Sequence, residues 1–182
     1  DLIKDRFLAF HVSGGTTEAV LVTPDREQIL KADIVAASID LKAGQAIDRT
    51  GVLLGMRFPC GAELEKEAEK SNRDFKIRAS MRGCNCSFSG IENKVKTMIA
   101  NGESKCDIAK FALESVRVSL DSMLSAVLQE YGSLPVVFAG GVSSNKTIRK
   151  TASEKYGAYF AEPRFSSDNA AGTAVFAALK SL

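Results

Sequence analysis

Histidine is nearly absent from this chain of 182 residues, and its scarcity limits the chemistry that the sequence supports. The single histidine, His11, has no second His or Cys at the spacing of a zinc site. The HExxH motif of zinc proteases is missing, and a lone histidine in a strand-like segment completes no Ser-His-Asp order. The phosphate-loop signature GxxxxGK[ST] is missing as well. These absences argue against a zinc protease, a serine hydrolase and a P-loop nucleotidase.

Long apolar runs are also lacking. None approaches the roughly 20 residues needed to cross a bilayer, and the N-terminus has no signal-peptide pattern, so we expect a cytoplasmic protein. The four cysteines, Cys60, Cys84, Cys86 and Cys106, match neither a zinc motif nor a secreted disulfide framework. We expect them to be free thiols. The chain begins at Asp1 and enters a strand almost at once, which indicates a segment of a longer protein or a shortened one.

The composition, with 45% hydrophobic and 25% charged residues, is that of a soluble globular protein, and we expect residues 1–182 to form a single domain. A net charge of +2 gives no overall argument for nucleic-acid binding. One local cluster of cations does suggest nucleic-acid binding, because two aromatic residues, Phe75 and Phe88, are interleaved with it. The cluster consists of Arg73, Lys76, Arg78, Arg82, Lys94 and Lys96. An ordinary solvated surface explains it equally well.

Hydrophobic patterning predicts three successive strands followed by alternating helices and strands. The expected strands are 7–12, 18–22, 28–39, 136–139 and 158–161, and the expected helices are 43–54, 62–70, 91–99, 107–131, 146–155 and one from Asn169. We expect Asp107 to cap the longest helix and Gly132 to end it, and residues 81–90 to be a loop. Strands that follow one another directly pair antiparallel, whereas strands joined through helices run parallel. The sequence therefore predicts an α/β fold with a five-stranded mixed sheet flanked by helices.

Two glycine pairs follow predicted strands, Gly14-Gly15 in the turn after residue 12 and Gly140-Gly141 after residue 139. Glycine lets a ligand approach the backbone, and successive N–H groups in such turns favour phosphate. Each pair alone is weak evidence, since many turns use glycine. Asp168 precedes the last predicted helix, where it is either a helix cap or an oxygen ligand for a metal or a metal-bridged phosphate. Together these features suggest that three strand and helix ends converge on one anionic ligand.

Six sequence blocks carry a family resemblance that covers nearly the whole chain. They are HVSGGTTE (11–18), AGQAIDRTGVLLG (43–55), FPCGAELEKEA (58–68), CSFSGIENKV (86–95), VVFAGGVSSNKTIR (136–149) and SSDNAAGTA (166–174). In order and spacing they resemble the C-terminal half of the TsaD/Gcp family. Its members are tRNA N6-adenosine threonylcarbamoyltransferases, formerly described as O-sialoglycoprotein endopeptidases or glycoproteases.

The resemblance implies an actin-like ATPase (ASKHA) fold, in which two ribonuclease-H-like lobes hold a ligand in the cleft between them. This chain would be the second lobe, which binds ATP or threonylcarbamoyl-adenylate and is inactive alone. The family transfers the threonylcarbamoyl group to N6 of the adenosine beside the anticodon of tRNA. Expected partners are tRNA, accessory subunits of the tRNA-modification complex, and a second copy of the chain through the apolar face left by the other lobe.

The resemblance also assigns roles to individual residues. His11, Val12, Ser13, Gly14 and Gly15 would contact the nucleotide phosphate; Asp48, Gly61 and Glu65 would hold the ribose; and Gly140, Gly141 and Asn145 would hold the nucleotide. Asp168 would be the third ligand of an iron or zinc ion. The family's other two metal ligands belong to an HxxGH motif that this sequence lacks, so the metal would need two histidines from the other lobe.

Two alternatives stay open beside the transferase lobe. Leu41 and Gln45 stand where acidic residues are common in the family, which suggests a diverged, noncatalytic binding or assembly module. The older glycoprotease label is the third hypothesis, and the single histidine makes it the weakest.

Overall fold

A five-stranded mixed sheet forms the centre of the computed structural model, which describes residues 2–162 and 170–180. The strands are β1 (Phe7–Val12), β2 (Thr17–Asp25), β3 (Ile29–Ala37), β6 (Val136–Ala139) and β7 (Tyr159–Phe160), in the order β3-β2-β1-β6-β7. Strands β1, β2 and β3 pair antiparallel, whereas β6 runs parallel to β1 and β7 runs parallel to β6. The predicted mixed sheet with an antiparallel edge is therefore confirmed.

Alternating side chains give the sheet one buried face. In β1, Leu8, Phe10 and Val12 are buried, while the residues between them are more exposed, as expected for a period of two. Phe10 stacks on Phe138 of β6 with ring centroids 4.9 Å apart, and Phe138 stacks on Phe160 of β7 at 5.1 Å. These aromatic pairs join three neighbouring strands, so the parallel half of the sheet is held by side chains as well as by backbone pairing.

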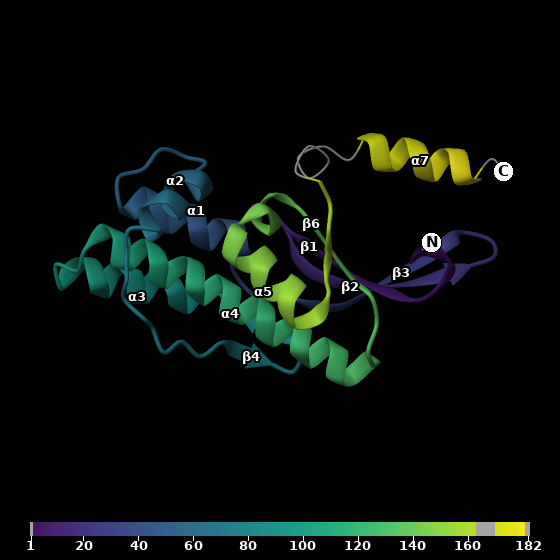
Figure 1. The fold of residues 1–182 in the computed structure, drawn as a ribbon, viewed down its shortest axis with the longest axis horizontal. Coiled ribbons are helices and arrows are strands. Elements are labelled where there is room, and N and C mark those ends of the chain that lie inside the picture. Colours follow the sequence, from purple (N-terminus) through teal and green to yellow (C-terminus); the bar gives the residue numbers. More distant parts are fainter. Residues whose placement is uncertain (1, 163–169, 181–182) are drawn as a thin grey trace.

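The helices pack around the long helix α4 (Lys105–Tyr131), which contacts α1, α2, α3 and α5 (Figure 1). Their bounds are α1 (Ala43–Leu53), α2 (Gly61–Ala68), α3 (Ser89–Ala100), α5 (Lys146–Tyr156) and α7 (Ala170–Lys180). Leucine, valine and methionine side chains recur along α4 at helical spacing and are buried in the core. Helix α7 stands apart from the others in Figure 1. Within the described residues, no helix is long and apolar enough to cross a membrane.

The predicted loop over residues 81–90 is wrong. Strands β4 (Ser80–Arg82) and β5 (Asn85–Ser87) form a small antiparallel hairpin there, and α3 begins at Ser89. Contacts from the end of β3 hold this hairpin. The backbone N–H of Ala37 donates to Oδ1 of Asn85 at 2.8 Å, and that of Ile39 donates to the carbonyl of Cys86 at 2.9 Å. Strands of three residues give little sequence signal, and partners distant in sequence stabilise these two.

The expected cap of the longest helix is also wrong, although its end at Gly132 is confirmed. Ser104 is the N-cap, because its Oγ accepts a hydrogen bond from the backbone N–H of Asp107 at 3.2 Å. Asp107 lies in the first turn, where a negative charge is favourable, and its carboxylate accepts a hydrogen bond from the Ser71 hydroxyl. Both residues suit the start of a helix, and the backbone path decides which one caps it.

Candidate functional site

The turn between β1 and β2 packs directly against the start of α1. Ser13 closes this turn, since its Oγ accepts from the backbone N–H groups of Gly15 and Thr16 at 3.3 and 3.0 Å. The N–H of Gly44, the second residue of α1, donates to the Ser13 carbonyl at 3.2 Å. A Cβ atom on Gly44 would stand 2.6 Å from the Cα of Gly14. Glycine at position 44 is therefore what lets the helix approach the turn.

The end of β6 also packs closely against the end of β1. Gly140 has a φ of +98°, which favours glycine, and a Cβ there would stand 2.3 Å from the carbonyl oxygen of Val12. The chain then forms a short 3₁₀ turn, η2 (Gly141–Ser144), and enters α5. Asn145 caps α5, its Oδ1 accepting from the N–H groups of Thr147 and Ile148 at 3.1 Å each. Its side chain is held by the helix start, and the residue is only 9% exposed.

Two carboxylates tie the surrounding helices together. Oδ1 of Asp48, on α1, accepts from the backbone N–H of Cys60 at 2.7 Å, just before α2 begins. Oε1 of Glu65, on α2, accepts from the backbone N–H of Lys146 at 2.9 Å, at the start of α5. Each carboxylate therefore uses one oxygen to position a helix start, and the second oxygen has no described hydrogen-bond partner.

A cavity of about 450 Å³ opens between the β1–β2 turn, α1, α2 and the segment from η2 to the cap of α5. It is lined by Gly14, Gly44, Ile47, Asp48, Phe58, Pro59, Gly61, Ala62, Glu65, Leu113, Gly141, Val142, Ser144 and Asn145. Six of these were expected site residues from the sequence: Gly14, Asp48, Gly61, Glu65, Gly141 and Asn145. The structure thus brings four separate sequence blocks to one cavity.

The other expected residues that the structure describes do not line this cavity. Val12 is buried in the core, and Ser13 and Gly140 shape the turns. Gly15 is exposed in the turn, and His11 is exposed on β1. Asp168, the expected metal ligand, lies outside the described residues.

Sequence reasoning missed several apolar residues that line the cavity. Leu113 comes from α4, where its spacing is that of any core residue, so no signal marked it. Phe58 is 74% exposed and lines the cavity with Asp48, and neither fact can be read from the sequence. An apolar wall beside a few polar groups, here the carboxylates of Asp48 and Glu65, is the usual make-up of a small-molecule site.

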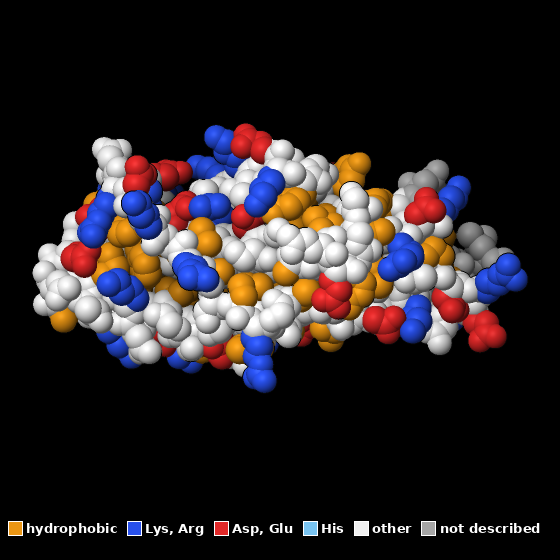
Figure 2. All heavy atoms as spheres, turned by 90° about the horizontal axis from the view of Figure 1, so that it is seen from below, with side chains coloured by type: hydrophobic (Ala, Val, Ile, Leu, Met, Phe, Trp, Pro, Cys, Tyr) orange, Lys and Arg blue, Asp and Glu red, His pale blue; other side chains and the backbone are white. Residues whose placement is uncertain are grey.

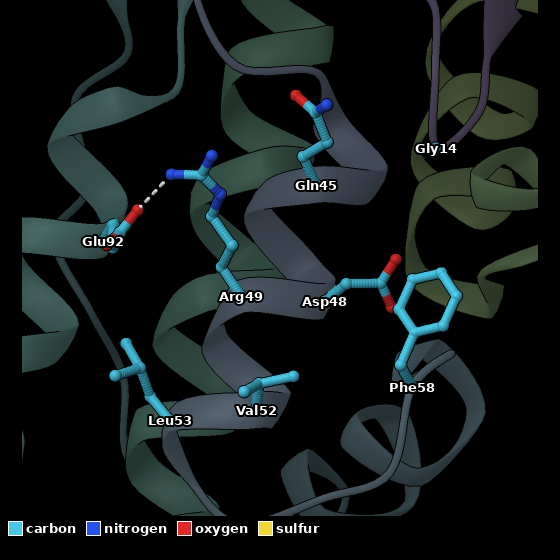
Figure 3. Close-up of a pocket in the computed structure, with 8 residues that line it drawn as sticks. All are labelled: Gly14, Gln45, Asp48, Arg49, Val52, Leu53, Phe58 and Glu92. Carbon is cyan, nitrogen blue, oxygen red and sulfur yellow. Dashed lines mark hydrogen bonds and ion pairs between the residues drawn. The ribbon is translucent and has the colours of Figure 1, made fainter.

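A second cavity, of about 600 Å³, lies on the other side of Asp48 (Figure 3). Its lining shares Gly14, Asp48 and Phe58 with the first cavity. Val52 and Leu53 of α1, 55% and 38% exposed, give it an apolar rim. On the opposite side, Arg49 forms an ion pair with Glu92 of α3 at 2.8 Å. The outward face of α1 therefore carries two exposed apolar side chains, Val52 and Leu53, beside charged ones next to the site.

The described residues do not fit a resident metal ion. No group of three or more His, Cys, Asp and Glu side chains is placed to hold one within residues 2–162 and 170–180. The one histidine, His11, does not line either cavity beside Asp48.

Solved structures share this fold at low sequence identity. HypF from T. kodakarensis superposes with a TM-score of 0.68 at 16% identity, over 86% of this chain and 31% of that one. Component A of (R)-2-hydroxyglutaryl-CoA dehydratase from Acidaminococcus fermentans gives 0.54 at 16% identity, over 87% and 56%. The activator of 2-hydroxyisocaproyl-CoA dehydratase from Clostridium difficile, solved with bound ADPNP, gives 0.53 at 13% identity, over 90% and 56%. These likenesses confirm the α/β fold of the actin-like ATPase (ASKHA) class.

Sequence comparison gives the family. The tRNA N6-adenosine threonylcarbamoyltransferase of Chlorobium chlorochromatii is 33% identical over 98% of this chain, and the chain spans 57% of that relative's length. The family model described as "TsaD: tRNA N6-adenosine threonylcarbamoyltransferase" matches residues 3–175. The residues that line the cavity and the blocks that carry the match are largely the same, and the chain belongs to the TsaD family.

Proposed function

We propose that this chain is the nucleotide-binding lobe of an enzyme that transfers a threonylcarbamoyl group from its adenylate to N6 of the adenosine beside the tRNA anticodon. The observation that carries the proposal is the cavity that joins Gly14, Asp48, Glu65, Gly141 and Asn145. A relative of the same family has this transferase as its name. The fold neighbour with bound ADPNP supports a nucleotide as the ligand.

The cavity offers groups suited to each part of an adenylate. Backbone N–H groups of glycine turns favour phosphate, and Gly14 and Gly141 line the cavity without side chains. The engaged first oxygens of Asp48 and Glu65 hold these carboxylates in place. Their second oxygens can accept hydrogen bonds from ribose hydroxyls. Ile47 and Leu113 supply apolar surface for a base.

We further propose that the lobe does not catalyse transfer alone. The chain spans 57% of the curated relative, and the part not covered would pack against the apolar rim beside Asp48. Val52, Leu53 and Phe58 would be buried there. In the isolated chain, this same face would mediate a homodimer, and accessory subunits of a tRNA-modification complex are further candidate partners. Product formed by the chain alone, from tRNA and the adenylate, would contradict this part of the proposal.

Isothermal titration with ATP and with a stable threonylcarbamoyl-adenylate analogue tests nucleotide binding. Asn145→Asp keeps a side-chain oxygen that caps α5, but it removes the amide donor and places a negative charge against the phosphate. We expect affinity to fall by about tenfold or more, which corresponds to ~1.4 kcal/mol, while the melting temperature changes little.

Ser104→Ala is the matched control. It removes the N-cap of α4 at a site that lines neither cavity, so it should lower stability by about 1 kcal/mol and leave nucleotide affinity unchanged. Equal nucleotide affinity in the Asn145→Asp variant and the wild type would reject the proposed role of Asn145. No binding of either nucleotide to the wild type would favour the noncatalytic module.

One structural observation weakens the case for that alternative. Gln45 stands where the family often has an acid, and its Oε1 accepts from the backbone N–H of Lys42 at 3.0 Å. Glutamine and glutamate perform this N-terminal capping role equally. Gln45 therefore keeps this structural interaction at the start of α1.

A further inference from the structure

The structure divides the cluster of six cations into paired and unpaired side chains. Arg73 pairs with Glu103 at 2.5 Å, and Lys96 pairs with Glu92 at 2.6 Å. The other four are Lys76, Arg78, Arg82 and Lys94, and none of them forms an ion pair with a carboxylate of the described residues. These four charges have no ion-pair partner among the described residues.

Three of the unpaired cations, Lys76, Arg78 and Lys94, line one cavity of about 470 Å³. The coil over residues 71–79 runs from α2 to β4 along the lower side of the molecule in Figure 1. It brings Lys76 and Arg78 to the first turns of α3, which carry Lys94. Figure 2 looks at this side, where Lys and Arg side chains stand around apolar surface. The remaining lining residues are Ile77, Ser80, Ser87, Ser89, Gly90, Ile91, Phe111, Ser115 and Ser119, so no carboxylate lines the cavity.

The floor of this cavity consists of hydroxyl groups with free acceptor sites. The buried Ser115 donates its hydroxyl to the carbonyl of Phe111 at 2.7 Å, and the buried Ser119 donates to the carbonyl of Ser115 at 2.8 Å. Because each hydroxyl proton is committed to the backbone of α4, each oxygen can interact with a ligand only as an acceptor. Phe111 adds an aromatic side chain to the lining. The rim thus carries positive donors, and the floor carries acceptors beside an aromatic ring.

The carboxylate of Asp40, beside the start of α3, is already occupied. Its carboxylate accepts hydrogen bonds from the Ser87 hydroxyl at 2.5 Å, from the N–H of Phe88 at 2.8 Å and from the N–H of Ser89 at 3.3 Å. Burial alone would raise the pKa of Asp40, but these hydrogen bonds outweigh it and lower the pKa to about 2. Asp40 therefore anchors the start of α3, and it is not one of the residues that line the cavity.

We propose that this cavity holds one nucleotide of an RNA strand, with a backbone phosphate against Lys76, Arg78 and Lys94 and a ribose 2′-hydroxyl donating to Ser115 or Ser119. Its volume lies within the usual range of ligand sites. Phosphate contacts by exposed cations are the common means of strand binding, and the 2′-hydroxyl is the group that separates RNA from DNA. Arg82, on β4, adds a further unpaired positive charge for the RNA strand. The site shares no lining residue with the cavity beside Asp48, so it stands or falls independently of nucleotide binding there.

Fluorescence anisotropy with a labelled single-stranded RNA tests the proposal on the intact chain. The pocket variant replaces Lys76, Arg78 and Lys94 by Gln. The control variant replaces Arg6, Arg26 and Lys150 by Gln, which removes the same charge from exposed positions that do not line this cavity. One neutralised phosphate gives a slope of about 0.7 in log Kd against log salt, hence roughly threefold weaker wild-type binding between about 50 and 200 mM salt.

The pocket variant should bind RNA about tenfold or more weakly at the lower salt concentration and lose most of this salt dependence. The control variant should differ little from the wild type, and a DNA strand of the same sequence should bind more weakly than RNA. Equal RNA affinity in the pocket and control variants would overturn the proposal. So would an acidic peptide such as polyglutamate, or free phosphate, displacing the RNA at concentrations close to the RNA's own Kd.

Discussion

Gly44→Ala is the most direct test of how the candidate site is assembled. The new methyl group would stand 2.6 Å from the Cα of Gly14, and 2.8 Å from both the N of Gly14 and the carbonyl oxygen of Ser13. All three atoms belong to the backbone, so no side chain can rotate away. Helix α1 and the β1–β2 turn would have to separate, and the cavity that both of them line would widen.

The expected change in the free energy of unfolding of Gly44→Ala is the sum of two opposing effects. Overpacking of this kind costs about 1–3 kcal/mol, whereas replacing glycine by alanine within a helix gains up to ~1 kcal/mol. Gly90→Ala separates the steric effect from the propensity effect. Gly90 is likewise the second residue of its helix, and a Cβ there meets nothing within 4 Å. The propensity gain is then common to both variants, and their difference in stability measures the steric effect alone.

Urea unfolding of both variants should therefore show Gly44→Ala less stable than Gly90→Ala by about 1–3 kcal/mol. In thermal unfolding of a chain this size, the same difference corresponds to roughly 3–9 °C. Nucleotide affinity should also fall in Gly44→Ala, because Gly44 lines the cavity. If the two variants were equally stable, the close contact between α1 and the turn would be refuted.

Two further predictions concern titratable groups. Because the folded pKa of Asp40 is lowered from 3.8 to about 2, this carboxylate stabilises the fold above about pH 4, and the stabilisation is lost as the pH falls toward 2. The stability difference between wild type and Asp40→Asn, from urea unfolding, should shrink over that range, and a constant difference would contradict the assignment. Burial raises the pKa of Cys86 to about 12, so iodoacetamide at about pH 8 should leave it unmodified in the folded protein and modify it in urea. Mass spectrometry measures this, and rapid alkylation of folded Cys86 would show that the thiol is accessible.

Local sequence alone determined most of the secondary structure. The strands on either side of Ser13 and the helix that ends at Gly132 were predictable, because alternation, helical spacing and glycine turns act over a few neighbouring residues. The six blocks indicated the family for the same reason, since each is a short contiguous motif. The hairpin at residues 80–87 was missed because its stability comes from Ala37 and Ile39, more than 40 positions away along the chain.

Only the tertiary structure decided what the charged residues do. In sequence, Asp48 is a carboxylate on an amphipathic helix, and the fold shows that one of its oxygens fixes the start of α2. Arg73 and Lys76 look equivalent in the basic cluster, yet Arg73 is paired with Glu103 and Lys76 is unpaired beside a cavity. The partners in each case come from elements far apart along the chain, so no local pattern encodes them. The sequence determined the elements and the family, and packing determined which polar groups remain available for a ligand.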